Sequence, residues 1–323
     1  MLASTQSPAG RAANGFPHLS VIKESIKLLY KQLSPRRMKS FSKSLSPSEV
    51  EVPEKGDIDV KVQSLAGIIA RHLQLPKACI VVNFRDMDNP GRVELTGEGG
   101  YLVDLQTKYR NDHRDIGAVL AHEVTHVFLY RHGIQLPDIL ENELLTDTAA
   151  AYLGVGWLCL NAHRVTMSRQ ERNVGPTKRE IRNTTKTEQL GYLTPDEFGY
   201  VLRKRSLAFG EEVDSAITSP AARSALYEGS TLAFGERWSA PIEGCSWWEK
   251  WGYFWNRRYV RNVHQKSGLT GNSHRFGGYQ FEVADSMRVI FECPVCSQKL
   301  RLPTDKRVVA YCSVCETSIN CST

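Results

Sequence analysis

Three residues within one stretch of five can hold and use a metal ion, because His122, Glu123 and His126 form the pattern H-E-x-x-H. Histidines four residues apart lie on one face of a helix, so both imidazoles can reach the same Zn²⁺. Glu123 lies beside them and can take a proton from a metal-activated water. Apolar residues at helical spacing surround the pattern and predict a helix that Asp115 caps. The chemistry indicated is hydrolysis, provided that a third ligand completes the site.

One candidate for the third ligand is His132, which lies ten residues after His122. This spacing matches H-E-x-x-H-x-x-G-x-x-H, but Leu129 stands where that pattern has the glycine that turns the chain. In an unbroken helix His132 points away from the metal. Gly133 is then a good helix terminator, and His132 is simply a residue of the last turn.

The other candidate lies on a second helix, which is expected to begin near Asp138. Glu143 and Asp147 are four residues apart and therefore share a face of that helix. Glu143 could complete a His₂Glu site, and Asp147 could orient a ligand histidine through its second ring nitrogen. Glu141 is a rival ligand, although its neighbour four residues on is Leu145. A solvated acidic face is the alternative without any metal.

H-E-x-x-H followed by a helix with E-x-x-x-D resembles the gluzincin metallopeptidases, and the short separation of the two helices is similar to minigluzincins and ImmA/IrrE-type proteases. The resemblance covers roughly residues 57–165. It implies a catalytic zinc on His122, His126 and Glu143, with Glu123 as general base and Asp147 behind a ligand histidine. The His or Tyr that stabilises the oxyanion in many gluzincins has no assigned counterpart in this sequence.

The residues before the metal pattern predict a helix over 60–74, a buried strand over 79–84 and a second strand near 100–106. Zincins usually place such a second strand at the sheet edge, where a substrate peptide can pair with it. We therefore expect an edge strand that binds substrate through Gly100, Tyr101, Leu102 and Val103. An ordinary α/β core would show the same periodicities.

Four cysteines near the C-terminus form two C-x-x-C pairs with fifteen residues between the pairs. This spacing predicts a zinc ribbon, in which four thiolates hold Zn²⁺ and stabilise a small fold. The predicted ligands of this structural zinc are Cys293, Cys296, Cys312 and Cys315. Disulfides are the alternative, but nothing in the sequence suggests export.

The amino-acid composition suggests how the chain is divided into domains and connecting segments. Residues 1–55 are rich in Ser, Pro and Lys and are expected to be flexible, while 56–235 would form the zincin-like domain. Within that domain, 165–190 are polar and basic and are expected to form a loop. Residues 236–287 form a Trp-rich connecting region, whose aromatic residues we expect to pack in a core rather than to stack on bases or hold a partner. Residues 288–323 form the zinc ribbon.

The 323 residues carry a net charge of +6, a mild excess that permits acidic partners without requiring nucleic acid. No run of eighteen apolar residues and no signal peptide is apparent. We therefore expect a cytoplasmic protein without a membrane partner, whose partners are a protein or peptide substrate and a protein or nucleic acid bound through the ribbon.

The predicted fold class is α+β, with a zincin-like core, a mostly helical second half and a C-terminal zinc ribbon. The predicted function is an intracellular zinc metallopeptidase in which Glu123 activates a zinc-polarised water against a peptide bond. One alternative is a ribbon-based adaptor for nucleic acid or protein whose zincin core is inactive. Another is a zinc hydrolase that cleaves a bond other than a peptide bond.

Overall fold

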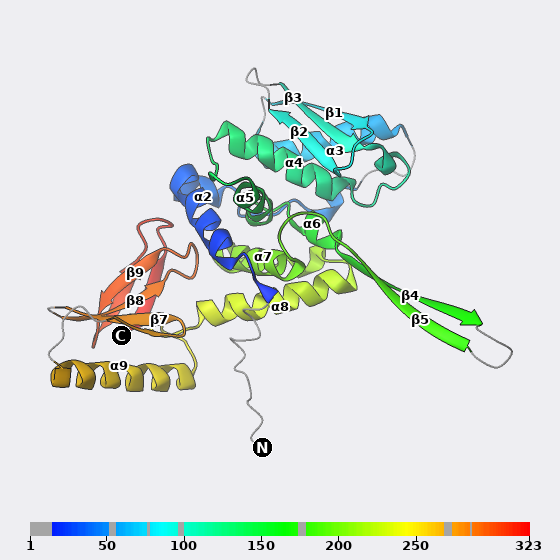
Figure 1. Cartoon of the computed structure of the whole chain (residues 1–323). Coiled ribbons are helices and arrows are strands. Elements are labelled where there is room, and N and C mark those ends of the chain that lie inside the picture. Colours follow the sequence, from blue (N-terminus) through cyan, green and yellow to red (C-terminus); the bar gives the residue numbers. More distant parts are fainter. Residues whose placement is uncertain are drawn as a thin grey trace.

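Amphipathic helices and short β-branched runs alternate along the sequence, and the chain accordingly forms an α+β structure (Figure 1). The structure is a computed structural model. It describes residues 15–51, 56–75, 78–95, 100–173, 179–267, 273–284 and 286–323, except for the side chains of 165–188, 266 and 267.

The N-terminal part corrects the expectation of a flexible segment over 1–55. Residues 19–39 form helix α2 (Leu19–Lys39), which bends at Ser34 and Pro35 and is followed by the short turn η1 (Pro47–Glu49). Ile22, Ile26 and Leu29 recur at helical spacing and are fully buried. Their burial makes α2 part of the core, although the surrounding Ser, Pro and Lys residues suggested disorder. Residues 1–14 lie outside the described residues.

A three-stranded sheet precedes the metal-pattern helix. It contains β1 (Cys79–Arg85), β2 (Gly91–Leu95) and β3 (Gly100–Gln106) in the order β1-β3-β2. Strand β3 pairs with β1 in parallel and with β2 antiparallel. The strand that contains Gly100, Tyr101, Leu102 and Val103 is therefore central, and its predicted place at the sheet edge is wrong. The edge on the side of the metal pattern belongs to β2, which the sequence analysis did not identify.

Helices fix the position of this sheet and of the two metal-binding segments. Helix α3 (Ile58–His72) confirms the helix predicted over 60–74, and a short turn η2 (Thr107–Arg110) leads from β3 towards α4 (Ile116–Arg131). Helix α5 (Ile139–Tyr152) begins as predicted, because the Asp138 carboxylate accepts a hydrogen bond from the Glu141 amide at 3.0 Å. Asp115 precedes α4 without capping it and instead forms an ion pair with Arg164. Helix α6 (Trp157–Asn161) follows α5.

The expectation of a loop over 165–190 is wrong for most of its described residues, which form two paired strands. Strands β4 (Arg164–Asn173) and β5 (Arg179–Glu188) pair antiparallel and extend away from the helices (Figure 1). Two helices then complete this half of the molecule, α7 (Pro195–Phe209) and α8 (Pro220–Arg237), with the short turn η3 (Asp214–Ala216) between them. Thr194 and Glu197 form the capping box that starts α7.

The C-terminal part combines one long helix with short strands. Its elements are α9 (Trp247–Ser267), a sheet of β6 (Ser273–Phe276), β7 (Tyr279–Val283), β8 (Met287–Glu292) and β9 (Lys299–Pro303), and the pair β10 (Arg307–Tyr311) and β11 (Ser318–Ser322). Among the described residues no helix is long and apolar enough to cross a bilayer. The location of the protein in the cell stays a prediction.

The zinc-ribbon segment is docked on the helices through a buried polar network. Lys204 of α7 is 1% exposed, and its ammonium donates to the Pro294 carbonyl at 2.5 Å and to Glu236 at 3.1 Å. Lys23 of α2 joins the same network, with Nζ 2.6 Å from Glu236 and 2.8 Å from Glu292. The ribbon therefore shares an interface with α2, α7 and α8.

Candidate metal centres

The first centre lies where α4 crosses α5. His122 and His126 project from one face of α4, and Glu143 projects from α5 towards both. His122 Nε2 lies 3.1 Å from His126 Nε2, and each of these nitrogens lies 3.1 Å from Glu143 Oε2. The three predicted ligands of the catalytic zinc are thus brought together.

The hydrogen bond at Nδ1 of each histidine determines whether its Nε2 atom can act as a metal ligand. His122 Nδ1 lies 2.8 Å from Asp147 Oδ1, a carboxylate that can only accept, so this nitrogen carries the proton. Thr146 donates its hydroxyl proton to the Asn142 carbonyl at 2.9 Å, so its oxygen accepts from His126 Nδ1 at 3.2 Å. When both rings are neutral, their Nε2 lone pairs converge with the Glu143 carboxylate, an arrangement that suits a bound cation.

The two Nε2 atoms and Glu143 Oε2 form a triangle whose dimensions fit zinc. Ligands at about 2.0–2.1 Å in a tetrahedral zinc site lie about 3.3 Å apart, close to the 3.1 Å separations observed. Two nitrogens and one carboxylate oxygen leave a fourth position for water or substrate, as in catalytic zinc sites. Asp147 and Thr146 supply the outer hydrogen bonds that fix the ligand rings.

The pKa values of His122 and Glu143 also favour positive charge at this site. Burial opposes protonation of His122, but the charge and hydrogen bond of Asp147 and the hydrogen bond with Glu143 outweigh it, and the pKa of His122 is raised well above its usual value. Burial also favours the neutral form of Glu143, yet hydrogen bonds from His122 and His126 lower its pKa to about 2. A proton on His122 thus competes with the metal, and metal binding releases it.

Glu123 lies beside the ligands and against the edge strand. Its side chain is buried, and burial raises its pKa although the two neighbouring histidines oppose the shift. A Cβ atom added at Gly91 of β2 would lie 2.7 Å from Glu123 Oε1 and 2.4 Å from Val119 Cγ1. Only a glycine permits this close approach of β2 to the carboxylate.

A pocket of about 380 Å³ opens at these residues. Strand β2 forms one wall with Gly91, Arg92, Val93 and Leu95, and Leu190, Gly191 and Tyr192 form another. The metal ligands and Glu123 line its floor together with Asn142 and Cys159. The polar groups that could do chemistry therefore face a space that is bordered by a sheet edge.

Asp147 also holds the turn that carries Tyr192. Its Oδ2 accepts hydrogen bonds from the backbone amides of Tyr192 and Leu193, the latter at 3.0 Å. Gly191 has a φ of +94°, and a Cβ there would lie 2.7 Å from Asp147 Oδ2. The Tyr192 ring stacks on His122 with centroids 6.0 Å apart. One carboxylate thus positions both a metal ligand and an aromatic side chain above it.

His132 lies outside the centre, as the unbroken helix predicted. Helix α4 continues through Leu129, and His132 Nδ1 bonds with the Phe128 carbonyl at 2.7 Å. Gly133 follows with a φ of +62°, consistent with its predicted role as a helix terminator. Glu141 is likewise absent from the ligand cluster found among the described residues.

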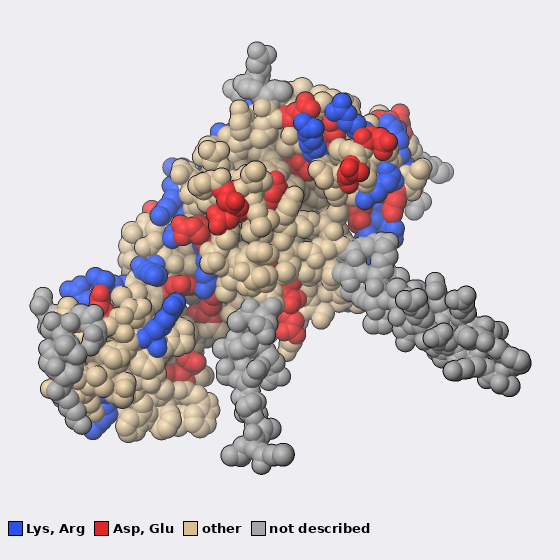
Figure 2. Space-filling model, in the orientation of Figure 1, with Lys and Arg blue, Asp and Glu red and all other residues tan. Residues whose placement is uncertain are grey.

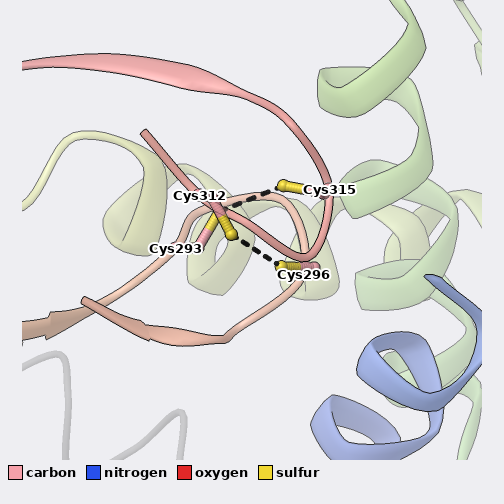
Figure 3. A group of neighbouring side chains, drawn as sticks. All are labelled: Cys293, Cys296, Cys312 and Cys315. Atoms are coloured by element: carbon pink, nitrogen blue, oxygen red, sulfur yellow. Dashed lines mark hydrogen bonds between the residues drawn. The ribbon is translucent and has the colours of Figure 1, made fainter. Parts of the chain in front are cut away.

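The second centre is the cysteine cluster at the C-terminal end (Figure 3). Sγ of Cys293 lies 3.5 Å from that of Cys315, and Cys296 and Cys312 are separated equally. All four thiols are free and buried. Disulfide bonds are about 2.05 Å long, whereas a tetrahedral site with Zn–S bonds of about 2.3 Å separates its sulfurs by a little under 4 Å. The four thiols therefore suit a metal ion.

The two cysteine turns have the same backbone conformation, which explains how they converge. Ser297 and Glu316 each follow the second cysteine of a pair, and both have a φ of +57°. In each turn the amide of this residue donates to the carbonyl of the first cysteine, at 2.9 and 2.8 Å. The duplicated turns bring the four thiols together, which is consistent with the predicted zinc ribbon.

Three residues of the first centre were not identified from the sequence: Gly91, Thr146 and Tyr192. Thr146 directly precedes Asp147 on the helix already singled out, so its position was a usable signal. Gly91 and Tyr192 come from segments that approach the centre only through the tertiary fold, and no local pattern marks them.

Comparison with known proteins identifies no relative of this chain. No protein-family model, no curated protein and no solved structure matches the chain. The account of its function therefore depends on the two centres themselves.

Proposed function

We propose that this chain is a zinc metallopeptidase of the gluzincin type with a zinc ribbon. The observation that carries the proposal is the convergence of His122, His126 and Glu143 at 3.1 Å separations beside the buried Glu123. A zinc ion held there would polarise both the attacking water and the scissile carbonyl. The arrangement of α4 and α5 agrees with the resemblance noted in the sequence, and the zincin assignment rests on that agreement.

Glu123 would act as the general base and then as the acid. Its carboxylate is placed to take a proton from water and to return it to the leaving amine. Burial raises the pKa of Glu123, which brings it nearer to neutral pH and suits a group that must both accept and donate. The proximity of β2 restricts where this carboxylate can lie.

The substrate would bind as an added strand along β2. This strand has one neighbour in the sheet, β3, and its residues form one wall of the pocket. Main-chain hydrogen bonds to such an edge hold a peptide extended with limited regard to sequence. The substrate-binding role that we assigned to residues 100–103 is accordingly proposed for β2.

Tyr192 is the candidate for stabilising the negative charge that develops on the carbonyl oxygen. Its ring lies over His122 and lines the pocket. Burial, followed by the charges of Glu143, Asp147 and Glu123, raises the pKa of Tyr192. The phenol therefore keeps its proton at neutral pH and can donate it to an oxyanion.

The ribbon would recruit a substrate or a partner. Lys299, Arg301, Lys306 and Arg307 are exposed on its strands and their connections, a surface suited to acidic groups.

Comparison of the wild type with Glu123→Gln tests the proposed activity. Both proteins would be incubated with a mixed peptide library, and new termini would be counted by mass spectrometry. We expect cleavage by the wild type and a loss of at least about 100-fold in the variant, because the amide cannot accept the proton. Zinc content should be equal in the two proteins.

The alternatives predict other outcomes. An adaptor with an inactive core would yield no new termini with either protein. A hydrolase of another bond would leave peptides intact but would lose activity on its own substrate in the same variant. Equal peptide cleavage by both proteins would contradict the role of Glu123.

A further inference from the structure

Helix α9 presents a row of aromatic side chains to solvent. They recur at spacings of three and four residues, which places them along one side of the helix. We call them the aromatic ridge: Trp247 (63% exposed), Trp248 (71%), Trp251 (50%), Phe254 (45%), Trp255 (48%) and Tyr259 (58%). Four of the six tryptophans of the chain are in this ridge, so the expectation that this region packs in a core is wrong for them. Contiguous exposure of this kind marks an interaction surface.

The opposite side of α9 fixes the helix to the sheet. Tyr253 and Val260 are buried, and the Tyr253 ring lies 4.9 Å from that of Tyr279 on β7. Arg257 donates to the C-terminal residue Thr323 at 2.8 Å and pairs with Asp305 at 3.0 Å. The helix is therefore held with the ridge outward, and the core does not need the ridge residues.

The ridge lies in the basic part of the chain. Residues 247–323 contain eleven Lys and Arg and six Asp and Glu, so they carry +5 of the net charge of +6. Lys250 and Arg258 are exposed on α9 beside the ridge, and neither forms an ion pair with a described carboxylate. In Figure 2 the end of the molecule over α9 is mostly uncharged, with both basic and acidic residues near its margins.

These features together favour a lipid surface. Tryptophan is enriched at the interface between lipid headgroups and acyl chains, and a helix with aromatic and basic residues binds there lying flat. We propose that the aromatic ridge of α9 adsorbs onto the surface of an anionic phospholipid bilayer. This inference concerns peripheral adsorption, does not depend on the proposed peptidase activity and adds a partner that the sequence analysis had excluded on the basis of spanning segments alone.

Other occupants fit the ridge less well. The Trp247 and Trp251 rings stack on each other, and the remaining ridge tryptophans meet their neighbours edge to face. Their faces are thus partly used, which disfavours stacking of single-stranded bases. A second copy of the chain would bring two segments of net positive charge together. A bilayer requires neither free ring faces nor an acidic protein surface.

Adsorption through the ridge would leave the first metal centre accessible. Helix α9 lies at one end of the molecule, and α4 with β2 lies at the other end (Figure 1). A peptide could therefore enter the pocket while α9 lies on a membrane. Variants of the ridge should consequently keep the wild-type turnover of a short soluble peptide.

Vesicle binding tests the proposal with the full chain. Vesicles of phosphatidylcholine alone and of phosphatidylcholine with one third phosphatidylglycerol would be mixed with the protein and sedimented. We expect binding to the anionic vesicles, a shift of tryptophan emission to shorter wavelength and weakening by salt. The double variant Trp251→Ser, Trp255→Ser should bind at least about tenfold more weakly, because the interfacial anchors are lost.

Two further variants keep the test decisive. Lys250→Glu with Arg258→Glu leaves the aromatic residues in place and should also weaken binding to anionic vesicles by at least about tenfold. Tyr227→Ser removes an aromatic residue of α8 that is more exposed (71%) than Trp251 and Trp255, and this variant should bind like the wild type. Unchanged zinc content would show that each variant is folded.

Three results would overturn the proposal. One is wild-type protein that stays in the supernatant with anionic vesicles at low salt. Another is equal vesicle binding by the wild type and both double variants. The third is ridge-dependent binding of a single-stranded oligonucleotide, or ridge-dependent dimerisation in solution, without binding to vesicles.

Discussion

At the scale of single residues, Asp147 connects the metal ligand His122 to the turn that carries Tyr192. One carboxylate oxygen accepts from the His122 ring, and the other accepts from two backbone amides of the turn. Hydrogen bonds of this kind fix the ring and the tautomer of a ligand histidine. One buried side chain thus positions residues on both sides of the pocket.

Glu143 and His132 can be separated by their effect on zinc binding. Glu143→Ala removes one of three converging ligand atoms and should weaken zinc binding at the first centre by at least about 100-fold, because the loss of a direct ligand exceeds the effect of an outer-shell partner. His132→Ala should leave the affinity unchanged, since His132 bonds to the Phe128 carbonyl. Competition with a chromogenic chelator measures both. A larger effect from His132 would contradict the assignment.

Gly91 offers a test of the distance between β2 and the general base. In Gly91→Ala the added methyl group would lie 2.7 Å from Glu123 Oε1 and 2.4 Å from Val119, so the carboxylate must move. We expect peptide turnover to fall about tenfold to 100-fold while zinc content stays at the wild-type level. Gly100→Ala is the matched control, because a Cβ there meets nothing within 4 Å. Equal activity of the two variants would show that β2 does not restrict Glu123.

At the scale of elements, the sequence predicted the segments whose patterns are local. The spacing of the two histidines and of Glu143 and Asp147 identified one face on each of two helices, and α4 and α5 bring those faces together. The start of α5 near Asp138 was equally visible in the sequence. These features depend on residues within one or two helical turns of each other.

Elements defined by tertiary contacts were not predictable in the same way. Strand β2 is five residues long, follows a run of Asp, Asn and Pro, and has no buried residue. Periodicity therefore gave no signal for it, and β3 was placed at the edge in its stead. The length and burial of helix α2 were not predicted, because Ser34 and Pro35 interrupt it and its surroundings are polar. Its burial depends on contact with α5 and α7, far away in the sequence.

The docking of the ribbon can be tested at Lys204. Lys204→Met removes the buried ammonium that joins the Pro294 carbonyl to Glu236. Loss of one member of a buried charged pair typically costs about 3–5 kcal/mol, so the free energy of unfolding should fall by several kcal/mol. Arg301→Met is the control, since Arg301 is 52% exposed in its pair with Glu282, and exposed pairs contribute about 1 kcal/mol or less.

Chemical denaturation of these two variants measures the difference. The same stability for Lys204→Met and Arg301→Met would mean that the ribbon is an independent domain over 288–323, as the sequence alone suggested. A large loss in Lys204→Met only would show that the ribbon and the helices fold as one unit.

At the scale of the whole molecule, the two candidate metal centres and the aromatic ridge lie on different elements among the described residues. The first centre is formed by α4 and α5, the second by the two cysteine turns, and the ridge by α9. We propose that a metal ion at the first centre would enable the chain to cleave peptides. The Cys₄ centre should hold its metal more firmly, because its four thiols are buried and docked against the helices.

The most direct test is a zinc titration that records bound zinc and peptide cleavage together. Protein stripped with a mild chelator should retain one zinc per chain and be inactive. Added zinc should restore cleavage in proportion to the second zinc bound and level off at two per chain, whereas His122→Ala should remain at one zinc and inactive. Cleavage that does not depend on the second zinc, or a filled second site that cleaves no peptide, would contradict the account.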